Sequence, residues 1–125
     1  MENYDQWMPL GLEGKHALVC GATQGIGLAA AQHLAALGAD VTILARNEDR
    51  LKKALESLPG SGSKAYAVAD FSDPESVAAA AEGVAAAKPV HVLVNNTGGP
   101  AGGPITEASP EAFEATFRQH LICNQ

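Results

Sequence analysis

Four short apolar runs alternate with segments of helical periodicity, and this alternation constrains the fold more than any other feature of the chain. The runs are residues 16–20, 41–45, 65–69 and 91–95, each the length of a strand buried on both faces. Because connections of helical length return each strand pointing the same way, the strands are predicted to be parallel. We therefore predict an α/β fold with a doubly wound parallel sheet, in a single domain, since 125 residues are too few for two.

Capping residues mark the ends of the predicted helices. The first helix begins near Gly25 and closes at Gly38, a C-terminal glycine. Asn47 is predicted to cap the second helix. Residues 72–75 (Ser-Asp-Pro-Glu) have the pattern of a capping box for the third helix, and residues 109–111 (Ser-Pro-Glu) open the last one, which continues to the end of the sequence.

Polar or glycine residues follow every predicted strand. They are Gly21, Arg46, Asp70, Asn95 and Asn96. In a doubly wound sheet the carboxyl ends of the strands border the ligand crevice, at the point where the direction of winding reverses. We therefore predict that these residues line one binding site.

A glycine-rich segment, residues 21–27 (Gly-Ala-Thr-Gln-Gly-Ile-Gly), joins the first predicted strand to the first helix. Glycine lets the chain turn sharply and lets a diphosphate approach the backbone, while the helix N-terminus supplies free N–H groups. The alternative is a tight turn that merely needs glycine, but a strand before it and a helix after it favour phosphate binding. A Walker loop is excluded, because Gly25 is followed by Ile26 rather than a Lys-Ser or Lys-Thr pair. The candidate phosphate-binding residues are Gly21, Thr23, Gln24, Gly25, Ile26 and Gly27.

Arg46 follows the second strand, where a dinucleotide fold that prefers NAD usually presents an acid to the ribose hydroxyls. A guanidinium pairs with a 2′-phosphate through two hydrogen bonds, so Arg46 and the adjacent Asn47 indicate NADP(H) rather than NAD(H). The alternative is a solvated arginine near a helix start, where a cation gains nothing from the helix dipole. Three further cations follow in the sequence, Arg50, Lys52 and Lys53. They either add positive charge to this site or lie on the solvent-exposed surface of the helix.

The third and fourth strands end in groups suited to the rest of a dinucleotide. Asp70 can accept a hydrogen bond from an adenine amino group, and Phe71 can present its backbone N–H. Asn96, Thr97 and Gly98 can set backbone and amide groups against the sheet and the ribose. The alternatives are a turn aspartate and asparagines that only cap a loop.

Composition excludes several classes of function. The net charge of −6 disfavours nucleic acid as a partner. The two cysteines and four histidines have no disulfide-framework or metal-ligand spacing, so no metal site is predicted. The polar leader, residues 1–11, resembles no signal peptide, and residues 77–94 are too interrupted to span a bilayer, so we expect a cytoplasmic protein with no membrane partner.

Together these motifs resemble the N-terminal half of a short-chain dehydrogenase/reductase, of the kind that includes the 3-oxoacyl-carrier-protein reductases. Gly21, Gly25 and Gly27 match the family's Thr-Gly-x-x-x-Gly-x-Gly motif, Asp70 matches its adenine-binding aspartate, and residues 95–98 match its Asn-Asn-Ala-Gly. The resemblance implies a Rossmann domain that transfers hydride between NADP(H) and a small carbonyl or alcohol. It also implies a homodimer or homotetramer, built in part by the last helix.

The resemblance covers residues 12–125, which we expect to form the dinucleotide-binding half of that domain. Cys20 replaces the motif's threonine and Thr97 its alanine, an exchange that would move a hydroxyl to a neighbouring strand. Gln24 stands where NADP-preferring members often have a second basic residue. His120 occupies the place of the family's catalytic asparagine, with Asn124 one turn further; these two either hold a relay water or are ordinary helix residues.

The family's catalytic acid is a Tyr with a Lys four residues later, and neither Tyr4 nor Tyr66 has such a lysine. Two interpretations stay open: the cofactor half of an NADP(H)-dependent oxidoreductase, or a non-catalytic NADP-binding sensor or scaffold module. The sequence stops within the last predicted helix and leaves the fourth strand as an apolar edge. We therefore expect these residues to be part of a longer chain, or a fragment ordered by another one.

Overall fold

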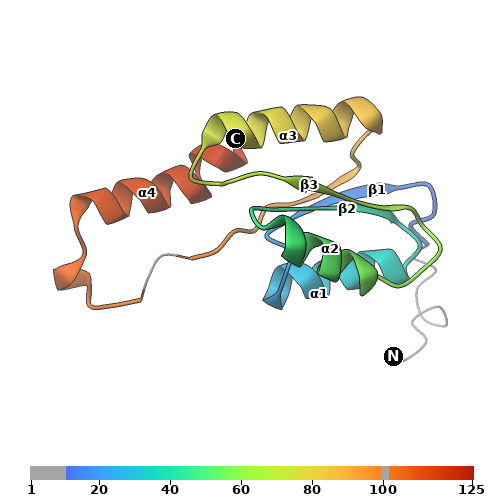
Figure 1. The fold of residues 1–125 in the computed structure, drawn as a ribbon, viewed down its shortest axis with the longest axis horizontal. Helices are drawn as coiled ribbons and strands as arrows, with labels where there is room; N and C mark the ends of the chain where they lie inside the picture. Colours follow the sequence, from blue (N-terminus) through green and yellow to red (C-terminus); the bar gives the residue numbers. More distant parts are fainter. Residues whose placement is uncertain (1–10, 100–101) are drawn as a thin grey trace.

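The computed structural model describes residues 11–99 and 102–125, and nearly all of the predicted leader, residues 1–11, lies outside them. In the described part, four parallel strands form one sheet in the order β3-β2-β1-β4 (Figure 1). The strands are β1 (His16–Cys20), β2 (Asp40–Ala45), β3 (Lys64–Val68) and β4 (Val92–Val94). The direction of winding reverses between β1 and β4, so the predicted doubly wound α/β fold is confirmed.

Helices cover both faces of this sheet. In Figure 1, α1 and α2 lie on one face, while α3 and α4 lie toward the other. The helices are α1 (Gly25–Ala36), α2 (Glu48–Glu56), α3 (Pro74–Ala87) and α4 (Pro110–His120), with short 3-10 turns η2 (Ile105–Glu107) and η3 (Ile122–Asn124). The helices α1, α2 and α4 begin where the sequence predicts, whereas α3 begins one residue later than a Ser72 cap would place it.

The first strand supplies both hydrophobic cores, as expected of a strand at the centre of a parallel sheet. Ala17 and Val19 point to the α1 and α2 face, whereas Leu18 and Cys20 point to the α3 face. All of β1 is buried. At the edge of the described sheet, β4 is much less covered, and the side chain of Leu93 is 55% exposed.

Side-chain caps account for most of the helix starts. The Asn47 side chain accepts a hydrogen bond from the Arg50 N–H at 3.0 Å, as predicted. The predicted capping box of residues 72–75 is wrong. Asp73 is the N-cap of α3 and accepts from the Glu75 N–H at 3.2 Å, while Ser72 turns back to Asp70. With Asp73 as the cap, Pro74 falls at the first helical position, where its missing N–H costs nothing.

The prediction that the last helix runs on to the end of the sequence is also wrong. The α-helix α4 ends at His120, and residues 122–124 form the 3-10 turn η3. Two side-chain bonds stabilise this tighter turn: Asn124 Nδ2 donates to the His120 carbonyl at 2.8 Å, and Cys123 Sγ donates to the Phe71 carbonyl at 3.1 Å. Asn124 therefore lies beyond the end of α4.

A buried histidine joins three segments at the amino ends of the strands. His16 is 4% exposed, and its Nδ1 lies 3.2 Å from the Pro89 carbonyl oxygen, which can only accept, so Nδ1 carries a proton. Its Nε2 lies 2.7 Å from Thr42 Oγ1 on β2, and its backbone N–H donates to His91 Nδ1 at 3.0 Å. These bonds hold the start of β1 against β2 and the segment that enters β4.

Because the thiol of Cys20 is buried, the free energy of unfolding should change with pH in the alkaline range. Burial raises the pKa of Cys20 from 9.0 to about 11. The unfolded chain therefore ionises first, so this contribution to stability is complete below pH 9 and is lost as the pH rises toward 11. A pKa difference of that size corresponds to about 3 kcal/mol.

We expect the free energy of unfolding to fall between pH 9 and pH 11, and Cys20→Ala to flatten much of that slope while lowering stability at pH 7 through lost packing. Denaturant titrations at a series of pH values measure both effects. Cys123→Ala is the matched control and should keep most of the slope. An unchanged slope in the Cys20 variant would contradict the assignment.

Candidate functional site

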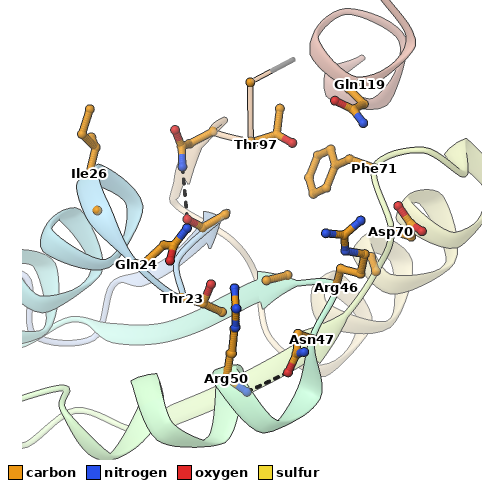
Figure 2. Close-up of a pocket in the computed structure, with 17 residues that line it drawn as sticks. Thr23, Gln24, Ile26, Arg46, Asn47, Arg50, Asp70, Phe71, Thr97 and Gln119 are labelled. Atoms are coloured by element: carbon orange, nitrogen blue, oxygen red, sulfur yellow. Dashed lines mark hydrogen bonds between the residues drawn. The ribbon is translucent and has the colours of Figure 1, made fainter. Parts of the chain in front are cut away.

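A pocket of about 610 Å³ lies at the carboxyl ends of the strands (Figure 2). It is where the reversal of winding predicts a ligand crevice. The residues predicted to line the binding site do so, except Gly27 and Asn95. Those that do are Gly21, Thr23, Gln24, Gly25, Ile26, Arg46, Asn47, Asp70, Phe71, Asn96, Thr97 and Gly98.

Two glycines of the β1–α1 turn have backbone angles that other residues rarely adopt. Gly21 has φ 61° and Gly25 has φ 58°, both in the left-handed region. A Cβ built on Gly25 would meet nothing within 4 Å, so the space above this residue is open. A bound group can therefore approach the backbone at Gly25 closely.

Gly27, unlike Gly25, is required for close packing of the backbone. A Cβ at Gly27 would overlap the Gly21 carbonyl oxygen and would lie 2.8 Å from Asn96 Nδ2. Gly27 thus does not line the pocket; it lets α1 pack directly against the turn at the end of β1. Asn96 completes this contact, because its Nδ2 donates to the carbonyl oxygens of Cys20 at 3.3 Å and Gly21 at 3.2 Å.

The N-terminus of α1 has no side-chain cap. Gln24 occupies the N-cap position without a side-chain bond to the helix, whereas side chains cap α2, α3 and α4. The first turn of α1 also contains no acidic residue. Free N–H groups and the positive end of a helix dipole therefore lie at the pocket, and both favour an anion.

One carboxylate, Asp70, is among the residues that line the pocket. Its Oδ1 accepts from the Ser72 backbone N–H at 2.9 Å and from the Ser72 hydroxyl at 2.7 Å. These two bonds hold the pKa of Asp70 below its usual value, and the Arg46 guanidinium lowers it further by a smaller amount. Asp70 is therefore ionised at neutral pH and can accept further hydrogen bonds.

The sequence prediction missed some of the pocket's residues. Gln119 reaches the pocket from α4, and Figure 2 shows its amide directed toward Phe71. No local pattern could place α4 over the crevice, because a long irregular connection precedes it. Arg50 also lines the pocket, although the sequence left open whether it was surface decoration. Ala45, Ala69 and Gly99 complete the lining.

His120 and Asn124 are not among the residues that line the pocket. Asn124 Oδ1 is buried and, among the described residues, has no hydrogen-bond partner. Thr97 lines the pocket, while Cys20 lies in the core on the α3 face. Whether Thr97 compensates for the hydroxyl missing at Cys20 therefore stays a prediction, as does a relay water at His120.

The described residues contain neither a metal-ligand cluster nor a membrane-spanning helix. No group of three or more His, Cys, Asp or Glu side chains in residues 11–99 and 102–125 is arranged to hold a metal ion. In the same residues, no helix combines the length and the apolar character needed to cross a membrane.

The close contact at Gly27 leads to a prediction about stability. Gly27→Ala should force α1 away from the β1 turn, with a loss of about 1–3 kcal/mol on overpacking, measured by denaturant unfolding. Gly99→Ala is the matched control, because a Cβ there meets nothing within 4 Å and φ is not positive. A Gly27 variant as stable as the Gly99 variant would show that the contact is loose.

Comparison with known proteins gives consistent matches over this part of the chain. A model of the short chain dehydrogenase family matches residues 15–122. Gluconate 5-dehydrogenase of Gluconobacter oxydans is 40% identical over 108 residues, which are 82% of this chain and 41% of that protein.

Solved structures of similar proteins match the chain over the same region. L-sorbose reductase from Gluconobacter frateurii, crystallised with NADPH and L-sorbose, superposes with a TM-score of 0.85 at 32% identity, over 94% of this chain and 46% of that one. A metagenomic short-chain oxidoreductase in complex with NADP gives 0.80 at 37% identity, over 90% of this chain and 52% of that one. The chain thus spans about half the length of the relatives it matches.

Proposed function

This chain belongs to the short-chain dehydrogenase family, and from that premise we propose that residues 12–125 are the dinucleotide-binding half of an NADP(H)-dependent oxidoreductase. The observation that carries the proposal is the uncapped N-terminus of α1, which lies at the pocket beside the open space above Gly25. Relatives of known structure with NADPH or NADP bound support the choice of cofactor.

The backbone at Gly25 and the first turn of α1 would hold the pyrophosphate of the cofactor. The N–H groups of the first turn of α1 donate to its oxygens, and the helix dipole stabilises its charge. The cofactor, when bound, supplies the hydride or accepts it. The protein residues of this half bind and orient it.

Charge and polarity set the orientation of the dinucleotide. Arg46 and Asp70 make one end of the pocket polar, and we assign the adenosine to that end. The Arg46 guanidinium binds the 2′-phosphate, and the Asp70 carboxylate accepts from the adenine amino group. At the other end Ile26 is 85% exposed, and an apolar side chain so open in a pocket favours contact with the nicotinamide.

The substrate is a small carbonyl or alcohol in this proposal. By their names, the relatives compared above act on gluconate and sorbose, so sugars and sugar acids are the first compounds to test. The non-catalytic alternative is less well supported, because these relatives are named for oxidoreductase activity.

We also propose that the protein is cytoplasmic and self-associates. Two free thiols agree with a reducing compartment such as the cytoplasm. Exposed apolar side chains on α4, Phe113 and Phe117, and on its C-cap residue Leu121 agree with self-association into a dimer or tetramer.

The assignment of Arg46 predicts a change in cofactor preference. Wild-type protein should bind NADPH more tightly than NADH, and Arg46→Ala should remove most of the difference, about 1–3 kcal/mol for a charge-assisted pair. Titration calorimetry with each cofactor gives the two Kd values. Equal affinities of the wild type for NADPH and NADH would refute the assignment.

Turnover separates the two interpretations of the function. The intact protein should oxidise NADPH in the presence of at least one compound from a panel of ketoses, keto acids and simple ketones. Tight NADPH binding with no turnover across the panel would favour a sensor or scaffold instead.

A further inference from the structure

Two guanidinium groups line the proposed 2′-phosphate end of the pocket. Arg46 stands at the end of β2, and Arg50 rises from α2 one turn after the Asn47 cap. Figure 2 shows Arg50 extending toward Thr23, while Arg46 lies nearer Phe71 and Asp70. The two cations approach the same cavity from different elements.

Two carboxylates, Glu48 and Asp49, share the first turn of α2 with Arg50, and neither forms an ion pair with an arginine among the described residues. Glu48, in the first turn of α2, accepts from the Tyr66 hydroxyl at 2.9 Å and pairs with Lys52 Nζ at 3.5 Å. The ion pairs of the described residues are Lys52–Glu48 and Lys88–Asp40, and neither includes Arg46 or Arg50. The pocket therefore contains two arginines and one carboxylate, in a chain whose net charge is −6.

Neither guanidinium has an ion-pair partner among the described residues, so both are available to an anion in the pocket. The two like charges also repel each other. A dianionic group held between the two side chains would relieve that repulsion, and a phosphate monoester carries close to two negative charges at neutral pH.

We infer that Arg50 is a second specificity-determining residue for the 2′-phosphate, acting with Arg46 from the adjacent helix α2. The inference rests on the proposed function. Gln24, in the turn before α1, is neutral, so Arg50 supplies the second positive charge that the turn lacks. With NADH in the pocket, both guanidinium groups face a ribose hydroxyl and lose their anionic partner.

The test measures Kd for NADPH and NADH, and for the fragments adenosine 2′,5′-bisphosphate and 5′-AMP, on the full-length protein. Arg50→Ala should weaken NADPH about tenfold, the size of one charge-assisted contact, and weaken NADH less than about twofold. The Asn47 cap should persist, because it uses the Arg50 backbone N–H. Arg50→Gln is a second variant that keeps the length of the side chain.

Lys53→Ala is the matched control. Lys53 is an exposed cation on the same helix and is not among the residues that line the pocket, so this variant makes the same change in net charge without touching the site. Its effect on NADPH should be small. The double variant Arg46→Ala/Arg50→Ala should abolish the preference for the 2′-phosphate in both pairs of ligands.

Two results would overturn the inference while leaving the proposed function intact. One is an Arg50→Ala effect on NADPH no larger than that of Lys53→Ala. The other is an equal weakening of NADPH and NADH, which would assign Arg50 to the pyrophosphate or to the fold. Failure of the wild type to bind either dinucleotide would instead refute the proposed function itself.

Discussion

The direct contact between α1 and the turn at the end of β1 determines the geometry of the site. Gly27 has no side chain, so the helix backbone reaches the Gly21 carbonyl, and Asn96 joins the same carbonyl to the end of β4. This contact directs the N-terminus of α1 along the edge of the sheet. The open space at Gly25 and the uncapped N–H groups lie at this same end of α1. Arg46 and Asp70 then meet the same cavity because their strands are held in register with β1.

The two ends of the sheet have different chemistry. At the amino ends of the strands, His16 is buried and both of its ring nitrogens have hydrogen-bond partners, Pro89 and Thr42. At the carboxyl ends, polar side chains line an open pocket. A closed network of this kind stabilises register, while exposed cations and free N–H groups are suited to a ligand. The fold thus separates the residues that stabilise it from those available for binding.

Local signals predicted most of the fold and of the site, because strand ends in a parallel sheet converge whatever the connections are. One wrong prediction arose where two neighbouring residues could both cap a helix. The missed pocket residue lies on a helix that a long connection separates from the last strand. Ser72 and Asp73 are both good N-caps, and the position of Pro74 decided for Asp73. Asn124 left the helical pattern because its side chain bonds back to the His120 carbonyl. Gln119 depends on the path of a long connection, which no periodicity describes.

The missing cap on α1 has a consequence for the fate of the protein in a cell. A bound phosphate would accept hydrogen bonds from the backbone N–H groups that no side chain caps. Because only the folded chain offers this site, cofactor binding would raise the free energy of unfolding. The population of unfolded chain then falls as cofactor concentration rises. Because proteases act on the unfolded chain, the abundance of this protein would follow the supply of its coenzyme, without any dedicated regulator.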